Sequence, residues 1–417
     1  MKKTVFPHLF AAAFAVGFIL LSSGCCTKNE CGTKQTAQPQ APCLQKNFFL
    51  PEHIYAVPGL ECNIYFRNIF LAVNHANYSF DVICKSGRYG RHDLKRWRFT
   101  PKAEDGGKDI LLTIEVSDGR KVVASGSTTV HVAPSDAGKG REVVMLIVGD
   151  SLTNATVYPT RIHTLCKGAN NPKLVMLGTH RGSGRPPLPG GVAHEGYGGW
   201  KWDSFLTRWR EIDPAAKSTP IQRFYAKSKF LMLKDGKPVF SLANYLKKNN
   251  FKMPDVVTFQ LGVNDVFGAT DANRDQMIEK ILDNAEKLIA NFRREAPNAL
   301  IGVGFVTPGA NQDAFGNNYK CGQTSWGYYV NQFRLNQAMA RRFAGRDKLV
   351  MIPGNINLDS ENNFPAVKEA ANAENPTEVF RQSNGVHPAA SGYNQMGDAY
   401  FAWLKNMLAA KQEKNAK

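Results

Sequence analysis

The chain has 417 residues, of which 43% are hydrophobic and 21% are charged. This is an ordinary globular balance over more than one average domain length, so it excludes wholesale disorder, collagen-like repeats and coiled coil. The 52 Lys and Arg residues outnumber the 35 Asp and Glu residues and leave a net charge of +17, which favours anionic partners or surfaces without specifying a fold.

The amino terminus has the features of an export signal. Lys2 and Lys3 precede an apolar stretch, Leu9–Leu21, that is too short to span a membrane. We therefore expect residues 1–24 to be a signal peptide. The sequence that ends at Cys25 resembles a bacterial lipoprotein processing site, which implies acylation of Cys25 and a membrane anchor on the bacterial cell envelope. Ordinary secretion, or release into the periplasm, is the alternative.

Composition and periodicity divide the rest of the chain into four segments. Residues 25–46 are rich in Lys, Thr, Gln, Ala and Pro, which predicts a flexible tether. Residues 47–134 alternate with period two around a turn at Gly119, so we expect antiparallel strands in a small all-β, immunoglobulin-like sandwich. Residues 141–410 alternate buried strands with amphipathic helices, which predicts a three-layer α/β domain with a parallel sheet. Residues 411–417 are predicted to be a disordered tail.

Five apolar runs bounded by Gly, Pro or Asp predict the parallel strands, and the period of 3.6 residues between Ile278 and Phe292 predicts a helix. A sheet of this kind carries its active site beyond the carboxyl ends of its strands, so motifs at those ends have the most weight. The five runs are Val143–Val148, Leu174–Leu177, Val256–Leu261, Leu300–Val306 and Leu349–Ile352.

Two of these runs end in residues that suit ester chemistry. The first leads directly into Gly149-Asp150-Ser151, where a serine at the end of a buried strand has its hydroxyl held at the crevice. Taken alone, this tripeptide more often marks a turn or a helix N-cap. The run at Val256 leads into Gly262-Val263-Asn264-Asp265, where the Asn264 amide can donate a hydrogen bond to an oxyanion.

Two later segments supply the other groups that such chemistry needs. A glycine-rich loop reaches Gly196-Tyr197-Gly198-Gly199-Trp200, whose backbone N–H groups are candidates for a further oxyanion donor, although it can equally be a plain flexible loop. Near the carboxyl terminus, Asn384-Gly385-Val386-His387 precedes a predicted helix. His387 on this loop is a candidate general base for Ser151.

The four segments in this order resemble the SGNH or GDSL hydrolases, a family of serine esterases on a flavodoxin-like sheet. The resemblance covers residues 141–408, and it implies that Ser151 is the nucleophile and His387 the base. It further implies that Gly199, Asn264 and the Ser151 amide form the oxyanion hole. The neighbouring Asp150 and Asp265 are expected to brace their loops.

One position departs from the family pattern. The family usually has Asp three residues before the catalytic His, where this chain has Asn384. An amide can orient the imidazole but cannot stabilise the imidazolium by charge. Asp359 and Glu361 are candidates for a substitute carboxylate. We therefore expect catalysis to be weakened but not abolished.

The block Gly-Tyr-Gly-Gly-Trp, behind a β-sandwich, looks like that of exported esterases that remove acetyl groups from carbohydrate. Tyr197 and Trp200 are candidates to bind the sugar, with core packing as the alternative, and the insertion 212–250 can wall the cleft. We expect an acetylated carbohydrate substrate, no cofactor, no metal and no nucleic acid. The alternatives are a lipid or thioester hydrolase with the same catalytic residues, and a surface glycan-binding lipoprotein inactivated through Asn384.

Cysteine and histidine positions leave smaller questions open. Cys62 and Cys84 each alternate in phase with apolar neighbours, so they either form a disulfide or remain as two buried thiols. The nearest pairings for a metal, His180 with His194 among them, lack the spacing of a metal motif.

Overall fold

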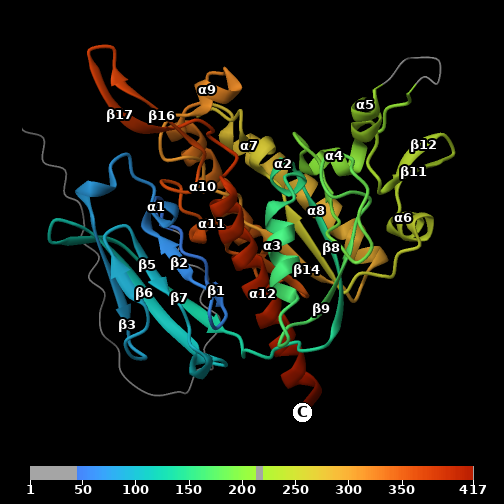
Figure 1. The fold of residues 1–417 in the computed structure, drawn as a ribbon, viewed down its shortest axis with the longest axis horizontal. Coiled ribbons are helices and arrows are strands. Elements are labelled where there is room, and N and C mark those ends of the chain that lie inside the picture. The colour runs from blue at the N-terminus through green and yellow to red at the C-terminus, as the bar shows by residue number, and fades with distance from the viewer. Residues whose placement is uncertain (1–44, 213–218, 417) are drawn as a thin grey trace, which may run out of the picture. The chain divides into compact units, whose positions relative to one another are not determined.

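Figure 1 shows a computed structural model of the chain, which describes residues 45–212 and 219–416. The predicted signal peptide and the predicted lipidation site at Cys25 lie outside the described residues. Across the part of the chain that is described, no helix combines the length and apolar character that a membrane span requires.

Six parallel strands form the central sheet, in the order β10-β8-β13-β14-β15, with β9 beside the first half of β8 on the same edge as β10. Numbered along the chain, the five long strands have the order 2-1-3-4-5, which is that of a flavodoxin-like sheet. The five predicted strands are confirmed, with ends that differ by at most two residues. Their bounds are β8 (Glu142–Gly149), β9 (Lys173–Leu177), β10 (Glu195–Gly196), β13 (Val256–Gln260), β14 (Leu300–Gly304) and β15 (Leu349–Ile352).

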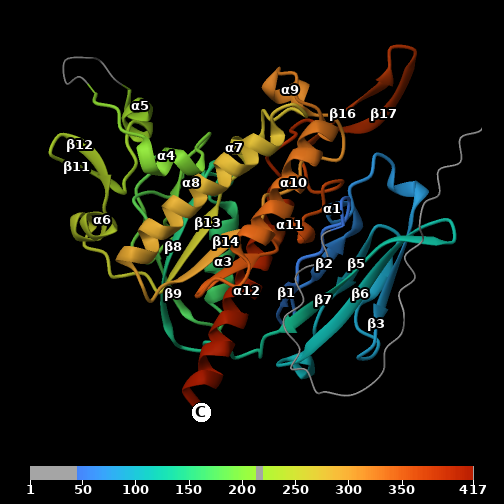
Figure 2. The ribbon, with the colours of Figure 1, turned by 180° about the vertical axis from the view of Figure 1, so that it is seen from behind.

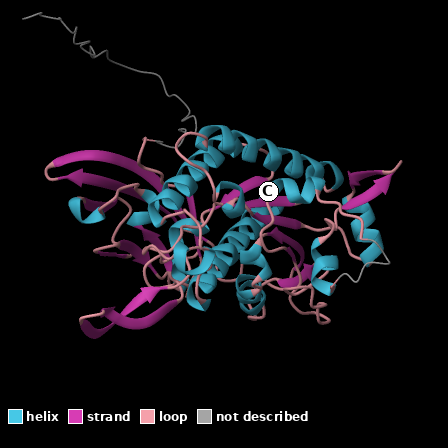
Figure 3. Ribbon diagram, turned by 90° about the horizontal axis from the view of Figure 1, so that it is seen from above, coloured by secondary structure: helices cyan, strands magenta, loops and turns pink. Residues whose placement is uncertain are grey.

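Helices cover both faces of this sheet, so the domain has three layers (Figures 1 and 2; Figure 3 shows the layers from above). On one face α3 packs against α12, and on the other α8 contacts both α4 and α10. The predicted amphipathic helix is confirmed as α8. A disordered tail was expected from residue 411, but α12 continues through residues 411–416. The bounds are α3 (Val157–Cys166), α4 (Trp202–Thr207), α6 (Leu242–Asn249), α8 (Arg274–Glu295), α10 (Ser325–Phe343) and α12 (Ala390–Ala416).

Short helices follow the ends of the sheet strands. These are α2 (Ser151–Asn154) after β8, α7 (Val263–Val266) after β13, α9 (Phe315–Tyr319) and α11 (Gly354–Asn357). Three of them, α2, α7 and α9, lie in the upper part of Figure 1. The insertion contributes α5 (Pro220–Tyr225) and the antiparallel strands β11 (Leu231–Lys234) and β12 (Lys237–Phe240). An exposed hairpin of β16 (Ala366–Asn372) and β17 (Asn375–Gln382), which the sequence pattern did not predict, leads into the His387 loop.

Two small sheets precede the α/β domain and share one apolar core. The predicted hairpin at Gly119 is confirmed, since it joins β6 to β7 in antiparallel pairing, whereas β1 pairs with β7 in parallel. Cys62 and Cys84 are free thiols, so the predicted alternative of a disulfide is not formed. The sheets are β1-β7-β6-β3 and β2-β5-β4, with bounds β1 (His53–Ala56), β2 (Cys62–Tyr65), β3 (Ser79–Cys84), β4 (Arg91–Asp93), β5 (Arg96–Phe99), β6 (Asp109–Asp118) and β7 (Lys121–Val132).

Buried polar contacts tie these sheets to the α/β domain. The Asn68 amide, just after β2, donates to the backbone carbonyls of Asn355 and Leu358 at 2.9 and 2.8 Å. The Tyr65 hydroxyl donates to Asp359 at 3.2 Å. Such bonds are costly to leave unmade once buried. The described residues of the N-terminal sheets and of the α/β domain belong to one compact unit.

Candidate active site

Ser151 lies where strand β8 ends, inside the parallel sheet. The Asp150 carboxylate caps α2 by accepting the Leu152 backbone N–H at 2.9 Å, which makes Ser151 the first helical residue. The Ser151 Oγ lies 2.8 Å from Nε2 of His387, 236 residues further along the chain. The structure therefore brings the predicted nucleophile and the predicted base within hydrogen-bond distance.

Close packing of small residues fixes the backbone behind Ser151. Strand β10 pairs Gly196 with Gly149, and the Tyr197 backbone N–H donates to the Gly149 carbonyl at 2.9 Å. A Cβ atom added at Gly196 would lie 2.6 Å from Cβ of Thr153, on the helix that carries Ser151. Only glycine permits this approach, so the glycine-rich loop is pinned against the strand and helix of the nucleophile.

The three segments predicted to form an oxyanion hole lie next to one another. The Asn264 side-chain amide donates to the Trp200 carbonyl at 3.0 Å, which joins the end of β13 to the loop that contains Gly199. Gly199 has a φ of +74°, a conformation that favours glycine. The Asp265 carboxylate accepts the Trp202 backbone N–H at 3.1 Å, so Asp265 braces the same loop, as Asp150 braces its own.

The structure contradicts a direct role of Tyr197 and Trp200 in binding a sugar. Both side chains are 0% exposed and they stack on each other, with ring centroids 4.1 Å apart. Trp202 is equally buried. From residue type alone, the two rings could either stack on a ligand or pack in the core. They pack in the core because the loop that carries them folds inward against β8.

Glu195, which the sequence analysis did not single out, is a fully buried carboxylate that fixes the start of the glycine-rich loop. Glu195 accepts the Thr179 backbone N–H at 2.6 Å and the Tyr245 hydroxyl at 2.8 Å, together with the hydroxyls of Tyr197 and Thr179. Burial raises its pKa, and these four donors oppose that shift. In the sequence, Glu195 is an acidic residue directly before the glycine-rich turn 196–199. That position was the signal from which its role could have been predicted.

The imidazole of His387 has a different partner from the one expected. Asn384 Oδ1 accepts the backbone N–H groups of Val386 and His387 at 3.0 and 2.9 Å and does not contact the ring. The group at Nδ1 is the hydroxyl of Tyr319, at 2.8 Å, which also donates to Asn384 Oδ1 at 3.3 Å. The expectation that Asn384 orients the imidazole directly was therefore wrong, because Tyr319 lies between them.

The two carboxylates considered as substitutes are engaged elsewhere. Asp359 accepts the backbone N–H groups of Glu361 and Asn362 and the hydroxyl of Tyr65. Glu361 forms an ion pair with Lys95 of the N-terminal sheets at 2.5 Å. Both carboxylates therefore stabilise the junction between the N-terminal sheets and the α/β domain. In the described part of the chain, no carboxylate hydrogen-bonds either ring nitrogen of His387.

Burial shifts the titration of groups around Ser151. It lowers the pKa of His387, so the imidazole is neutral over a wider pH range than a free histidine. It raises the pKa of Asp150 and of Asp265 to about 7, and each carboxylate has one oxygen without a hydrogen-bond partner. The neutral imidazole is the form that a general base requires.

The candidate metal residues also brace loops. The rings of His180 and His194 lie 4.6 Å apart, and each Nδ1 accepts a backbone N–H. Within the described residues no cluster of three His, Cys, Asp or Glu side chains is arranged to hold a metal ion.

The insertion reaches the candidate site. A Cβ atom added at Gly198 would lie 3.2 Å from the hydroxyl of Tyr225, a half-buried residue at the end of α5. Tyr225 therefore lies beside the glycine-rich loop, and whether the insertion walls a cleft there stays a prediction.

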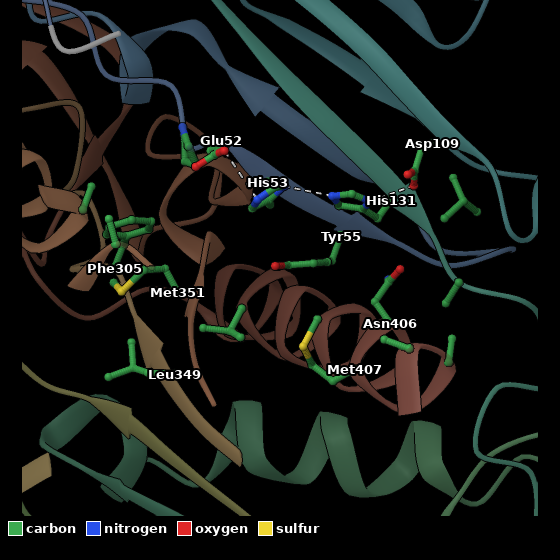
Figure 4. Close-up of a pocket in the computed structure, with 18 of the residues that line it drawn as sticks. Glu52, His53, Tyr55, Asp109, His131, Phe305, Leu349, Met351, Asn406 and Met407 are labelled. Carbon is green, nitrogen blue, oxygen red and sulfur yellow. Dashed lines mark hydrogen bonds and ion pairs between the residues drawn. The ribbon is translucent and has the colours of Figure 1, made fainter. Parts of the chain in front are cut away.

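A separate cavity of about 590 Å³ lies away from this site, between the N-terminal sheets and the α/β domain (Figure 4). His53 and His131 face it and hydrogen-bond each other at 3.0 Å, while Met351 and Met407 line its other side. Neither Ser151 nor His387 lines this cavity.

Comparisons with known proteins give structural matches only. The sequence matches no family model and no curated protein. A family 3 carbohydrate esterase from Talaromyces cellulolyticus is 15% identical, with a TM-score of 0.35 over 64% of this chain and 98% of that one. The family 3 carbohydrate esterase of Clostridium thermocellum is 17% identical, with a TM-score of 0.36 over 65% and 98% of the two chains.

A member of a carbohydrate acetylesterase family from Sinorhizobium meliloti is 14% identical, with a TM-score of 0.36 over 64% of this chain and 99% of that one. The chain thus resembles esterase structures over about two thirds of its length. With TM-scores below 0.5, these matches do not carry an activity over to this chain, whose chemistry has to follow from its own residues.

Proposed function

We propose that this chain is a serine esterase of the SGNH type that cleaves carboxylic esters through an acyl-enzyme on Ser151. The observation that carries the proposal is the 2.8 Å separation between Ser151 Oγ and His387 Nε2, formed by residues 236 positions apart at the carboxyl end of a parallel sheet. A serine hydroxyl becomes a useful nucleophile when an adjacent base takes its proton, and this distance is within reach of that transfer.

In the proposed reaction the Ser151 oxygen attacks the ester carbonyl while its proton moves to His387 Nε2. The tetrahedral intermediate collapses, the alkoxide leaves with that proton, and the acyl group stays on Ser151. A water molecule then repeats the sequence, losing its proton to His387 and releasing the carboxylic acid. Each proton that His387 accepts is returned to a leaving oxygen, so the cycle balances.

Three donors are proposed to stabilise the oxyanion. Ser151 begins α2, so its backbone N–H has no acceptor within the helix. Asn264 uses one N–H of its amide on the Trp200 carbonyl, which holds the group in place and leaves the other N–H for substrate. The Gly199 N–H is the third donor, on the loop that Asn264 fixes. Preorganised donors of this kind often make the largest contribution to acyl transfer.

We propose O-acetylated carbohydrate as the substrate class and removal of the acetyl group as the reaction. The support is the resemblance of the 196–200 block to exported acetylesterases. Because Tyr197 and Trp200 are buried, the aromatic surface offered to a sugar has to come from elsewhere, and we propose Tyr225, beside Gly198, as one such ring. We propose that the predicted signal peptide directs export and that lipidation at Cys25 holds the enzyme on the cell envelope. The N-terminal sheets are proposed to be an immunoglobulin-like sandwich.

The first experiment compares the wild type with Ser151→Ala. We expect the wild type to react with a fluorophosphonate probe and to cleave nitrophenyl acetate, and Ser151→Ala to do neither. Its circular dichroism and thermal unfolding should match the wild type. An active Ser151→Ala would contradict the mechanism, and an inactive wild type would favour the glycan-binding alternative.

A second experiment tests the substrate class. A panel of acetylated polysaccharides is assayed for released acetate, and nitrophenyl acetate is compared with nitrophenyl octanoate. Acetate release with little octanoate cleavage supports the carbohydrate deacetylase. Preference for the long acyl chain would instead indicate a lipid hydrolase with the same catalytic residues.

A further inference from the structure

A neutral imidazole carries its proton on one of two nitrogens, and only one tautomer lets His387 act as a base. Nε2 lies 2.8 Å from Ser151 Oγ, so Nε2 must be unprotonated if it is to receive the serine proton. The ring proton is then on Nδ1, where it needs an acceptor. The identity of that acceptor decides whether the Ser151–His387 pair is ready to react.

The atom at this position is the Tyr319 hydroxyl oxygen, 2.8 Å from Nδ1. A hydroxyl can donate its hydrogen or accept another, so Tyr319 alone does not fix the tautomer. Its hydrogen has a second acceptor in Asn384 Oδ1, at 3.3 Å. When the hydrogen points to Oδ1, the Tyr319 oxygen accepts Nδ1–H. When it points to Nδ1, the ring proton is on Nε2 and Ser151 cannot transfer its own.

The orientation of Asn384 favours the first arrangement. The backbone N–H groups of Val386 and His387 both donate to Oδ1, at 3.0 and 2.9 Å, so the oxygen rather than the amide nitrogen is held toward Tyr319. An oxygen at this position can only accept from the hydroxyl. Burial raises the pKa of Tyr319 to about 12, which keeps the hydroxyl protonated near neutral pH.

We propose that Tyr319 is a positioning residue that holds His387 in the Nδ1-protonated tautomer, and that Asn384 sets the direction of its hydroxyl. This inference rests on the proposed esterase function. Ser151, His387, Tyr319 and Asn384 then form one neutral chain of hydrogen bonds. During acylation the serine proton moves to Nε2, Nδ1–H stays on the ring, and no proton passes to Tyr319. The chain orients the base without supplying the negative charge that a carboxylate would.

The tautomer can be measured without substrate. Nitrogen-15 NMR of histidine-labelled protein distinguishes Nδ1–H from Nε2–H, and His387→Gln identifies the signal among the nine histidines. We expect the wild type to carry the proton on Nδ1 and Tyr319→Phe to gain the Nε2-protonated form. A wild type protonated on Nε2, or no change in Tyr319→Phe, overturns the proposal. Because this readout does not depend on turnover, it stands apart from any failure of the esterase proposal.

Kinetics provide the second readout. Loss of one partly buried hydrogen bond to the base should lower kcat of Tyr319→Phe roughly 10- to 100-fold, with KM unchanged. The matched control is Tyr78→Phe, since Tyr78 is also half-buried and its hydroxyl makes no hydrogen bond within the described residues. A Tyr319→Phe variant that keeps wild-type kcat, or that changes KM alone, contradicts a positioning role.

Variants at Asn384 test whether this residue acts on His387 through the Tyr319 hydroxyl or only by holding the His387 loop. Asn384→Asp keeps an acceptor for Tyr319 and for both backbone donors, so it should keep the Nδ1-protonated form in the nitrogen-15 spectrum. Asn384→Ala should gain the Nε2-protonated form and be as slow as Tyr319→Phe. If both residues act through one chain of bonds, the variant that combines Tyr319→Phe with Asn384→Ala is no slower than the slower single variant. Effects that multiply would show that Asn384 acts on His387 by another route and would overturn this part of the proposal.

Discussion

The two sides of the Ser151–His387 pair are held by different kinds of interaction. Behind Ser151 the contacts are made by backbone and glycine, since β10 pairs with β8 and Gly196 lies directly against Thr153. Behind His387 the contacts are side-chain hydrogen bonds on a loop, from Asn384 and Tyr319. The nucleophile is thus part of the packed sheet, whereas the orientation of the base depends on a few polar groups.

Substitutions on the two sides of the pair should therefore have different effects. Protein interiors are close-packed, so a substitution behind Ser151 should lower the free energy of unfolding more than it changes kcat. A change behind His387 removes a polar contact on a loop and should alter turnover at nearly constant stability. The predictions below test this division, beginning with the largest effect.

The sharpest test of the packed side is Gly196→Ala. The added Cβ would lie 2.6 Å from Thr153 Cβ and 2.8 Å from the backbone nitrogen of Asn154. Because a backbone atom cannot rotate away, we expect a loss of about 3 kcal/mol in the free energy of unfolding, measured in urea. The matched control is Gly268→Ala, since an added Cβ there has no neighbour within 4 Å. Equal stability of the two variants would show that the backbone behind Ser151 is not held by close packing.

A second test removes the charge beneath the same loop. In Glu195→Gln, the charged acceptor becomes a neutral amide, and the Tyr197 and Thr179 hydroxyls keep a bond to the new NH₂ group only if they turn from donors to acceptors. Part of the charge-assisted hydrogen bonding around Glu195 is therefore lost. We expect about 2 kcal/mol of destabilisation by thermal or urea unfolding. Glu374→Gln is the control, because Glu374 is exposed. A stable variant would mean that relief from burying the carboxylate offsets the lost bonds.

The same division explains how far the sequence could predict the site. Ser151, Asn264 and Gly199 each follow a strand or a glycine-rich turn, so local pattern placed them at the carboxyl end of the sheet. Tyr319 is 68 residues from His387 in the chain and has no local signal that pairs the two. Its contact arises only when the α9 segment folds over the His387 loop.

Residue type was also insufficient where burial decides the role. Tyr197 and Trp200 have the chemistry of sugar-stacking rings, yet they pack inward because the loop that carries them is tied to β8. Asp359 has the charge that a triad needs, yet it is taken up by Tyr65, which is 294 residues away in the sequence. Both outcomes depend on long-range packing, which periodicity and spacing do not encode.

The smallest expected effect is on the pH dependence of kcat/KM, which reports on His387. His387 acts as a base only when neutral, and burial disfavours its charged form, so its pKa is below the ordinary 6.5. The acid limb of kcat/KM should therefore have its midpoint below pH 6.5, measured between pH 4.5 and 8 on nitrophenyl acetate. Asp150 and Asp265, with pKa values raised to about 7, titrate in the same range. In Asp150→Asn the midpoint should stay where it is if His387 sets it. A wild-type midpoint above pH 6.5 that neither Asp150→Asn nor Asp265→Asn moves would instead mean that a negative charge stabilises the imidazolium. The neutral chain behind His387 would then be the wrong description.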